Sequence, residues 1–180
     1  LLGFGVVLAW QFGREFSDGT VTGLFAIPVQ RRTMGAAKLL VYLGWALAVS
    51  SGLLVTLVVG GVSFGFGLPG NEVWPLLARD YGLALLTAGL AIPAAWAATL
   101  GRGLLSGIAT IIGVIVLAQV AVFAGIGSWF PFSSPGLWAA TAGAGGHTEV
   151  SALQLALVVP VAAGFAGLAL HAWHRLQLDR

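Results

Sequence analysis

Four long apolar runs constrain this chain more than any other feature of its sequence. Each run is about 20 residues long or longer, is bounded by charge or by Gly/Pro clusters, and has no charged side chain in its interior. The runs cover residues 39 to 63, 81 to 100, 103 to 127 and 151 to 173. Runs of this length cross a bilayer as helices, whereas barrel strands would give alternating segments of about ten residues. The sequence therefore predicts an all-α, polytopic helical membrane protein.

Composition and charge support this class and exclude several others. Of the 180 residues, 58% are hydrophobic and only 8% are charged, compared with about 25% charged in a soluble domain. Eight basic against six acidic side chains are too few for a nucleic-acid surface. The chain has no cysteine, which excludes a disulfide framework, a thiolate metal site and a thiol nucleophile.

A fifth apolar segment, LLGFGVVLAW at residues 1 to 10, is too short to cross the membrane at 1.5 Å per residue. It has neither the basic leader nor the small-residue cleavage site of a signal peptide. We interpret residues 1–11 as the end of a membrane helix whose beginning is missing. Residues 1–180 would then form a single transmembrane domain with four complete helices, and six are expected in the full chain.

The distribution of Lys and Arg predicts the orientation of the chain in the membrane. Arg79 alone lies on one predicted side of the membrane, and the other seven basic residues lie on the opposite side. These seven are Arg14, Arg31, Arg32, Lys38, Arg102, Arg175 and Arg180. The positive-inside rule therefore places residues 12–38 and the C-terminus in the cytoplasm and residues 128–150 outside. The expected location is the inner or plasma membrane, with several passes.

Much of the charge lies in EFSDGTVTGLFAIPVQRR, residues 15 to 32, between two membrane helices. On a helical wheel, its apolar and polar residues fall on opposite halves. The apolar half holds Phe12, Phe16, Val21, Leu24 and Ile27, and the polar half holds Arg14, Glu15, Asp18 and Thr22. This pattern predicts an amphipathic helix along the inner membrane surface, weakened by Gly19 and Gly23 and ended by Pro28. On periodicity alone it is either an interfacial anchor, the plainer interpretation, or a docking surface for a cytoplasmic partner.

A spaced set of residues in this stretch resembles a pattern that recurs in the permease subunits of type-2 ABC exporters. The set consists of Glu15, Gly19-Thr20, Leu24, Pro28, Arg31 and Lys38. The segment WFPFSSPGLWA at 129 to 139 is similar to the Pro- and aromatic-rich outer segment of those permeases. The resemblance implies that residues 12–38 connect the second and third of six membrane helices and form a cytoplasmic coupling helix that fits a cleft in the ATPase subunit. The chain departs from the family at Gln30, where Ser or Thr is frequent, and in the missing first helix.

The resemblance also implies the partners and the site residues. The chain would pair with a second permease subunit, as a homodimer or a related heterodimer, and with two copies of an ABC ATPase subunit. ATP and Mg would be bound by the ATPase, so that this chain would carry no cofactor and no catalytic residue. The expected coupling residues are Glu15, Asp18, Gly19, Thr20, Leu24, Pro28, Arg31 and Lys38. No residue is identified as substrate-binding.

Energetic reasoning supports an ATP-driven transporter without the resemblance. Ion-driven carriers normally keep an ionisable residue within the membrane to bind or relay the ion, and the four runs contain no Asp, Glu, Lys or Arg in their interiors. The chain also lacks the phosphate-binding loop G-x-x-x-x-G-K-[ST]. If the protein is a pump, another polypeptide must hydrolyse the ATP. The apolar spans favour a hydrophobic or amphipathic substrate.

Two other functions remain open on the sequence alone. The chain could be a membrane scaffold or assembly subunit whose charged stretch recruits a soluble protein. It could also be a channel, although its spans carry few hydroxyl groups to line a pore. His171 and His174 lie one helical turn apart and could share a metal, but without a third ligand we interpret them as interfacial residues and predict no metal site.

Three polar or helix-breaking residues inside the spans also carry predictions. Gln119 could bond to a neighbouring helix or to substrate, and a bond to a neighbouring helix is the plainer interpretation. Pro93 and Pro160 each remove a backbone hydrogen bond from a span, and we expect a kink beside each of them.

Overall fold

The computed structural model describes residues 1–20, 23, 30–140 and 150–176. Every regular element within these residues is a helix, which confirms the predicted all-α class. The helices are α1 (Leu2–Ser17), α3 (Arg31–Ser63), α4 (Val73–Leu90), α5 (Pro93–Leu100), α6 (Leu104–Phe123), α7 (Ser134–Ala140), α8 (Ala152–Ala156) and α9 (Val158–Arg175).

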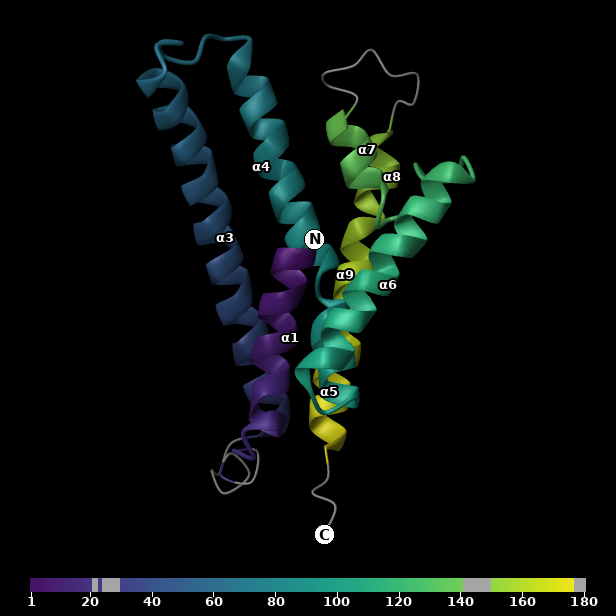
Figure 1. Ribbon diagram of the computed structural model, residues 1–180. Coiled ribbons are helices and arrows are strands. Elements are labelled where there is room, and N and C mark those ends of the chain that lie inside the picture. The colour runs from purple at the N-terminus through teal and green to yellow at the C-terminus, as the bar shows by residue number, and fades with distance from the viewer. Residues whose placement is uncertain (21–22, 24–29, 141–149, 177–180) are drawn as a thin grey trace.

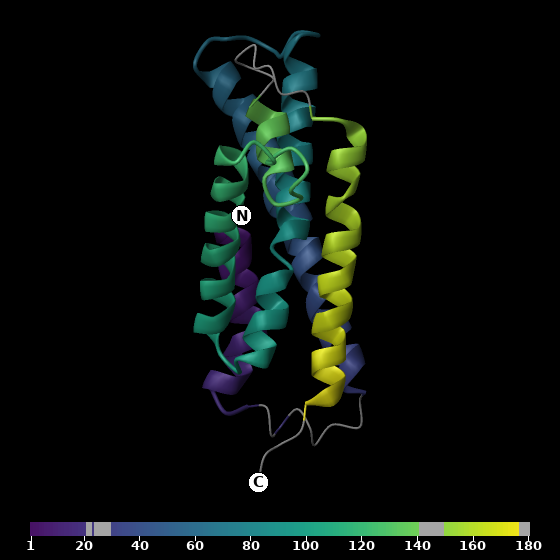
Figure 2. The ribbon, with the colours of Figure 1, turned by 90° about the vertical axis from the view of Figure 1, so that its right-hand side faces the viewer.

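The helices run along one long axis and form two groups that converge at one end (Figure 1). One group contains α3 and α4, the other contains α6 and α9, and the shorter α1 and α5 lie near the converging end. Figure 2 shows the same bundle turned by 90°, with α9 running along one side. The converging end holds Arg14, Arg31, Arg102 and Arg175, and we call it the basic end.

Four stretches of helix are long and apolar enough to cross a membrane, which confirms a polytopic membrane protein. They are Arg31–Ser63, Val73–Leu100, Leu104–Phe123 and Ala152–Arg175. Many large apolar side chains on these stretches are exposed on the surface of the chain. Exposed apolar surface of this kind is expected where helices face lipid or other membrane helices rather than water.

The most buried helix is α5, which packs against α1, α6 and α9. Its inner face consists of Ala94, Ala95 and Ala98, all of which have no exposed surface. Small side chains allow membrane helices to approach closely, so that van der Waals contact replaces the hydrophobic driving force that lipid does not provide. The approach of α1 to α6 has the same basis, because a Cβ atom on Gly107 would lie 2.5 Å from the Cβ of Ala9.

The helix is interrupted near both prolines at which a kink was predicted. The span of residues 73–100 divides between Leu90, which ends α4, and Pro93, which begins α5. The turn between them is closed by the tighter bonds from the N–H of Ala91 to the oxygen of Ala88 and from Ile92 to Gly89, both 3.2 Å. The last span breaks at Leu157 between α8 and α9, where Pro160 provides no N–H for the carbonyl group of Ala156.

Candidate functional site

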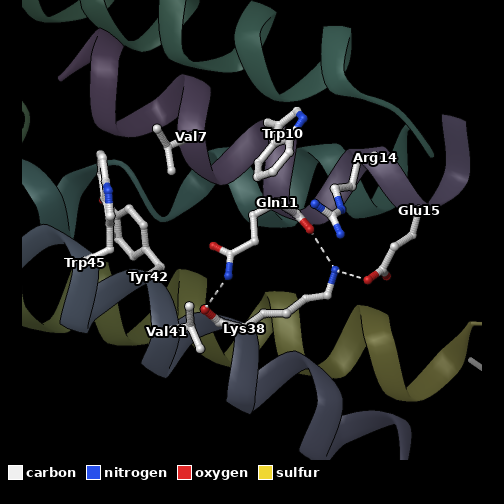
Figure 3. Close-up of a pocket in the computed structure, with 9 residues that line it drawn as sticks. All are labelled: Val7, Trp10, Gln11, Arg14, Glu15, Lys38, Val41, Tyr42 and Trp45. Atoms are coloured by element: carbon white, nitrogen blue, oxygen red, sulfur yellow. Dashed lines mark hydrogen bonds and ion pairs between the residues drawn. The ribbon is translucent and has the colours of Figure 1, made fainter. Parts of the chain in front are cut away.

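The charged stretch predicted to couple the chain to a partner begins and ends on two helices that meet at the basic end. Glu15 lies in the last turn of α1, and Lys38 lies about two turns into α3. The Nζ atom of Lys38 is 2.7 Å from Oε1 of Glu15, and both side chains are largely buried, at 15% and 13% exposed. This ion pair therefore closes the connection between α1 and α3 (Figure 3).

A reciprocal pair of hydrogen bonds strengthens the same junction. Lys38 Nζ donates to the backbone oxygen of Gln11 at 2.7 Å, and Gln11 Nε2 donates to the backbone oxygen of Lys38 at 3.0 Å. The ammonium group thus lies toward the C-terminal end of α1, where the helix dipole favours a positive charge. Each helix supplies one side chain and one carbonyl group to this pair of hydrogen bonds. The pair therefore fixes the position of α1 along its axis relative to α3.

The buried ring of Trp173, near the end of α9, brings a third helix to this junction. Lys38 Nζ lies 4.9 Å from the centre of the Trp173 ring and 5.3 Å from that of Phe12, within the range of cation–π attraction. The two rings meet edge to face, with 6.1 Å between their centres. Trp173 Nε1 in turn donates to Thr99 Oγ1 on α5 at 3.1 Å. Lys38 is therefore linked directly to α1 and α9, and through Trp173 to α5.

The electrostatic balance of the junction depends on both charges being present. Glu15 Oε2 is buried without a hydrogen-bond partner among the described residues, so the ion pair to Oε1 is the main compensation for burying this carboxylate. Removing one member of a buried pair leaves an uncompensated charge and costs about 3–5 kcal/mol, although the net value of an intact pair is small. The pair therefore acts chiefly as a constraint on how α1 and α3 fit together.

A pocket of about 430 Å³ opens beside the ion pair, between α1 and α3 (Figure 3). Its wall combines the charged groups with apolar and aromatic side chains, among them Val7, Val41 and Trp45. The guanidinium group of Arg14 lies over the ring of Trp10, 4.7 Å from its centre. Tyr42 closes another side of the pocket and donates its hydroxyl hydrogen to the backbone oxygen of Ala88 on α4 at 2.8 Å.

Other predicted coupling residues lie in the connection between α1 and α3. Asp18, Gly19 and Thr20 form an exposed turn directly after α1. Gly19 has φ = +67°, a left-handed conformation that glycine adopts without strain. Leu24 and Pro28 lie outside the described residues.

Arg31 begins α3 and donates a hydrogen bond to the backbone oxygen of Leu176 after α9. The structure therefore brings Glu15 together with Lys38 and places Arg31 beside α9.

The prediction of one amphipathic helix starting at residue 12 is wrong in its first part. Residues 12 to 17 continue α1, and the helix ends at Ser17 because the chain turns through Gly19. Phe12 and Phe16 accordingly pack against Trp173 inside the bundle, not against a membrane surface. The second half of the predicted helix falls mainly on residues outside the described part of the chain.

Sequence reasoning did not identify the role of Trp173 at the junction. The side chain is only 1% exposed, because Lys38, Phe12 and Thr99 surround it. Gln11 was missed as well, although it is a polar residue one helical turn before Glu15, a spacing that places both on one face of α1. Gln119 is exposed on α6, so the interhelical bond predicted for it is not made within the described chain.

The histidine pair gives no indication of a metal site. Both His171 and His174 are exposed near the end of α9. Within the described residues, no group of three or more His, Cys, Asp or Glu side chains is arranged to hold a metal ion.

Comparison with known families adds to this geometry. A family model described as ABC-2 family transporter protein matches residues 1–125, which include α1, α3, α4, α5, α6 and the Glu15–Lys38 junction. The chain belongs to the ABC-2 transporter family. It is therefore a membrane permease of an ABC transporter, which confirms the resemblance noted in the sequence. Searches of curated proteins and of solved structures each gave no match.

Family membership also gives the general setting in which the permease works. It implies embedding in a membrane and partnership with an ABC ATPase. The matched region covers the whole junction between α1 and α3, including the charged stretch that connects them. The junction therefore lies within the region that the family model matches.

Proposed function

We propose that this ABC-2 permease couples ATP hydrolysis by a separate ATPase subunit to the export of a hydrophobic or amphipathic substrate. The observation that carries the proposal is the junction at Lys38, which binds α1 and α3 together on either side of the charged stretch. A force applied to residues 18–30 would reach both helices at once. Contacts of Lys38 with Trp173 and of Arg31 with Leu176 would pass it on to α9.

The mechanism follows from how tightly the basic end is packed. Packed helices move as rigid bodies and switch between discrete arrangements, because well-packed contacts do not deform continuously. ATP-driven closure of the ATPase would displace the exposed turn at Asp18, and α1, α3 and α9 would tilt together about the core around α5. Alternation between two tilts would expose a substrate path first to one side of the membrane and then to the other.

The proposed assembly contains two permease chains, as a homodimer or a related heterodimer, and two ATPase subunits. ATP and Mg are bound by the ATPase subunits, and this chain contributes no catalytic residue. The basic end faces the cytoplasm, because the positive-inside rule favours Lys and Arg there. The protein accordingly resides in the cell membrane with its C-terminus inside.

The substrate class is inferred from the spans. The described membrane stretches present extensive apolar surface and few polar groups. A strongly charged substrate crossing such a path would lose its hydration without compensation, whereas an apolar or amphipathic one would not. Lipids, hydrophobic peptides and lipophilic drugs belong to this class.

The test separates docking from transmission by using two variants of the full-length protein with its ATPase in proteoliposomes. Asp18→Lys reverses an exposed charge in the turn and should weaken ATPase co-purification about threefold to tenfold. Glu15→Gln leaves the turn unchanged but breaks the ion pair with Lys38. The Glu15→Gln variant should still bind the ATPase, and the ATPase should still hydrolyse ATP. The amount of lipophilic dye transported per ATP hydrolysed should fall.

The matched control is Glu72→Lys, which reverses an exposed acidic residue at the opposite end of the bundle. This variant should keep both ATPase binding and transport. Unchanged coupling in Glu15→Gln, in protein that is folded, would refute transmission through the junction. If folded wild-type protein brings down no ATPase, the chain acts instead as a membrane scaffold.

A further inference from the structure

A second cluster of cationic groups at the basic end is separate from the Lys38 junction. Three adjoining pockets, of about 330, 700 and 380 Å³, surround the end of α9 and share His171. Their linings contain four arginines and two histidines and, among the described residues, no Asp or Glu. These basic groups are Arg31, Arg32, Arg102, Arg175, His171 and His174.

The pocket between α5 and α9 combines charge and apolar surface in a definite order along the helices. Arg102 follows the end of α5, and Arg175 is the last residue of α9, so both cations lie at the basic end. Leu100 is the last residue of α5, and Leu168 lies about two turns before Arg175 on α9; both line the same pocket and are 58% and 45% exposed. The cationic end and the apolar wall are therefore contiguous in one groove.

The backbone at Arg102 provides an independent observation. Arg102 has φ = +48°, and it is the only residue other than glycine with a positive φ in the described chain. A left-handed conformation costs an L-residue about 1–2 kcal/mol, and glycine adopts it without this cost. Glycines stand on both sides of Arg102 in the turn, yet the strained position holds an arginine. Strain of this kind is commonly kept where a side chain has a function.

We propose that the groove between α5 and α9 binds an anionic phospholipid from the leaflet at the basic end. The phosphate group would lie between the guanidinium groups of Arg102 and Arg175, with His171 as a further hydrogen-bond donor. One acyl chain would lie along Leu100 and Leu168. Basic pockets between membrane helices are known sites for anionic lipid headgroups, with each Lys or Arg contributing about 1 kcal/mol near the surface.

The cationic groups at the helix ends, with exposed leucines beside them in the same groove, favour a phospholipid over a soluble phosphate or a protein as the ligand. A soluble phosphate would use the cations but leave the exposed leucines without a partner, whereas a phospholipid satisfies both. A contact with the ATPase would lie beyond the helix ends and would not extend to the depth of Leu168. The proposal does not depend on the coupling function, because it concerns different residues of α5 and α9.

Native mass spectrometry of the full-length protein, released gently from detergent, would test this proposal. Phosphatidylglycerol and phosphatidylcholine with the same acyl chains are titrated separately, and glycerol 3-phosphate is added as a soluble competitor. We expect phosphatidylglycerol to bind more tightly than phosphatidylcholine, and glycerol 3-phosphate not to displace it. The double variant Arg102→Gln/Arg175→Gln should weaken phosphatidylglycerol binding by about 25-fold, or about fivefold for each charge.

Arg14→Gln is the matched control, since it removes a positive charge from the same end but outside this groove. An equal loss of binding in Arg14→Gln, or equal binding of the two lipids by the wild type, would overturn the proposal. Displacement by glycerol 3-phosphate would assign the site to a soluble phosphate instead. Loss of ATPase co-purification with unchanged lipid binding would make it an ATPase contact. The wild-type lipid comparison decides the matter even if the double variant fails to fold.

Discussion

Replacement of Lys38 by methionine removes the charge at the centre of the α1–α3 junction while keeping most of the side-chain volume. The variant loses the 2.7 Å ion pair with Glu15 and the 2.7 Å bond to the oxygen of Gln11. It also leaves the Glu15 carboxylate, 13% exposed, without a positive partner in the junction. Removing one member of a largely buried pair costs about 3–5 kcal/mol, and the residual exposure to water places the expected loss near the lower limit.

The companion variant Lys38→Met/Glu15→Gln removes both charges. Because a buried ion pair is often no more stabilising than well-packed neutral groups, we expect this double variant to recover most of the loss and to differ from the wild type by about 1 kcal/mol. Glu15→Gln alone leaves the ammonium of Lys38 unpaired and should cost about 2–3 kcal/mol, since Gln11 still accepts its hydrogen bond.

The assay is the free energy of unfolding of the full-length protein, measured by denaturant titration in mixed micelles for the wild type, both single variants and the double variant. The expected coupling energy between the two positions is about 4–5 kcal/mol. Additive costs, with the double variant as unstable as the sum of the single variants, would refute the argument. In that case the ion pair would not be what holds α1 to α3.

Two further predictions concern helix packing and use the same unfolding assay. Gly107→Ala places a Cβ 2.5 Å from a side chain of α1 and should lower the free energy of unfolding by about 1–3 kcal/mol, whereas Gly113→Ala, with nothing within 4 Å, should be neutral or stabilising. An equal effect at both glycines would contradict close α1–α6 packing. Thr99→Val removes the acceptor of the Trp173 indole and should cost about 1 kcal/mol, with a shift in tryptophan fluorescence. Thr110→Val, which loses only a bond within its own helix, should leave the fluorescence unchanged.

Hydropathy predicted much of the fold because membrane spans are local features. A helix in lipid satisfies its own backbone hydrogen bonds, so about 20 apolar residues in sequence are sufficient to indicate it. The break before Pro93 was predictable for the same reason, since proline acts on the carbonyl group four residues earlier. Family membership was likewise recognisable from the spacing of Glu15, Gly19 and Lys38, which the match over residues 1–125 supports.

The candidate site was only partly predictable. The sequence singled out Glu15 and Lys38, but it placed Lys38 before the start of a span, because a charged residue is costly inside the membrane. In the structure Lys38 lies well inside α3, where Glu15 and the oxygen of Gln11 satisfy the charge. A hydropathy score is summed over one segment, and it does not include ion pairs or hydrogen bonds with another helix. The helix begins at Arg31, eight residues before the predicted span.

What the sequence alone determined was the class of protein, its spans and the family to which it belongs, because each depends on residues close together in the chain. Only the tertiary structure decided that Lys38 meets Glu15 and Trp173, and that Arg102 lies in one groove with Arg175. These residues are far apart in sequence and come together through the packing of small side chains around α5. That packing depends on the shapes of several helices at once, which no single segment encodes.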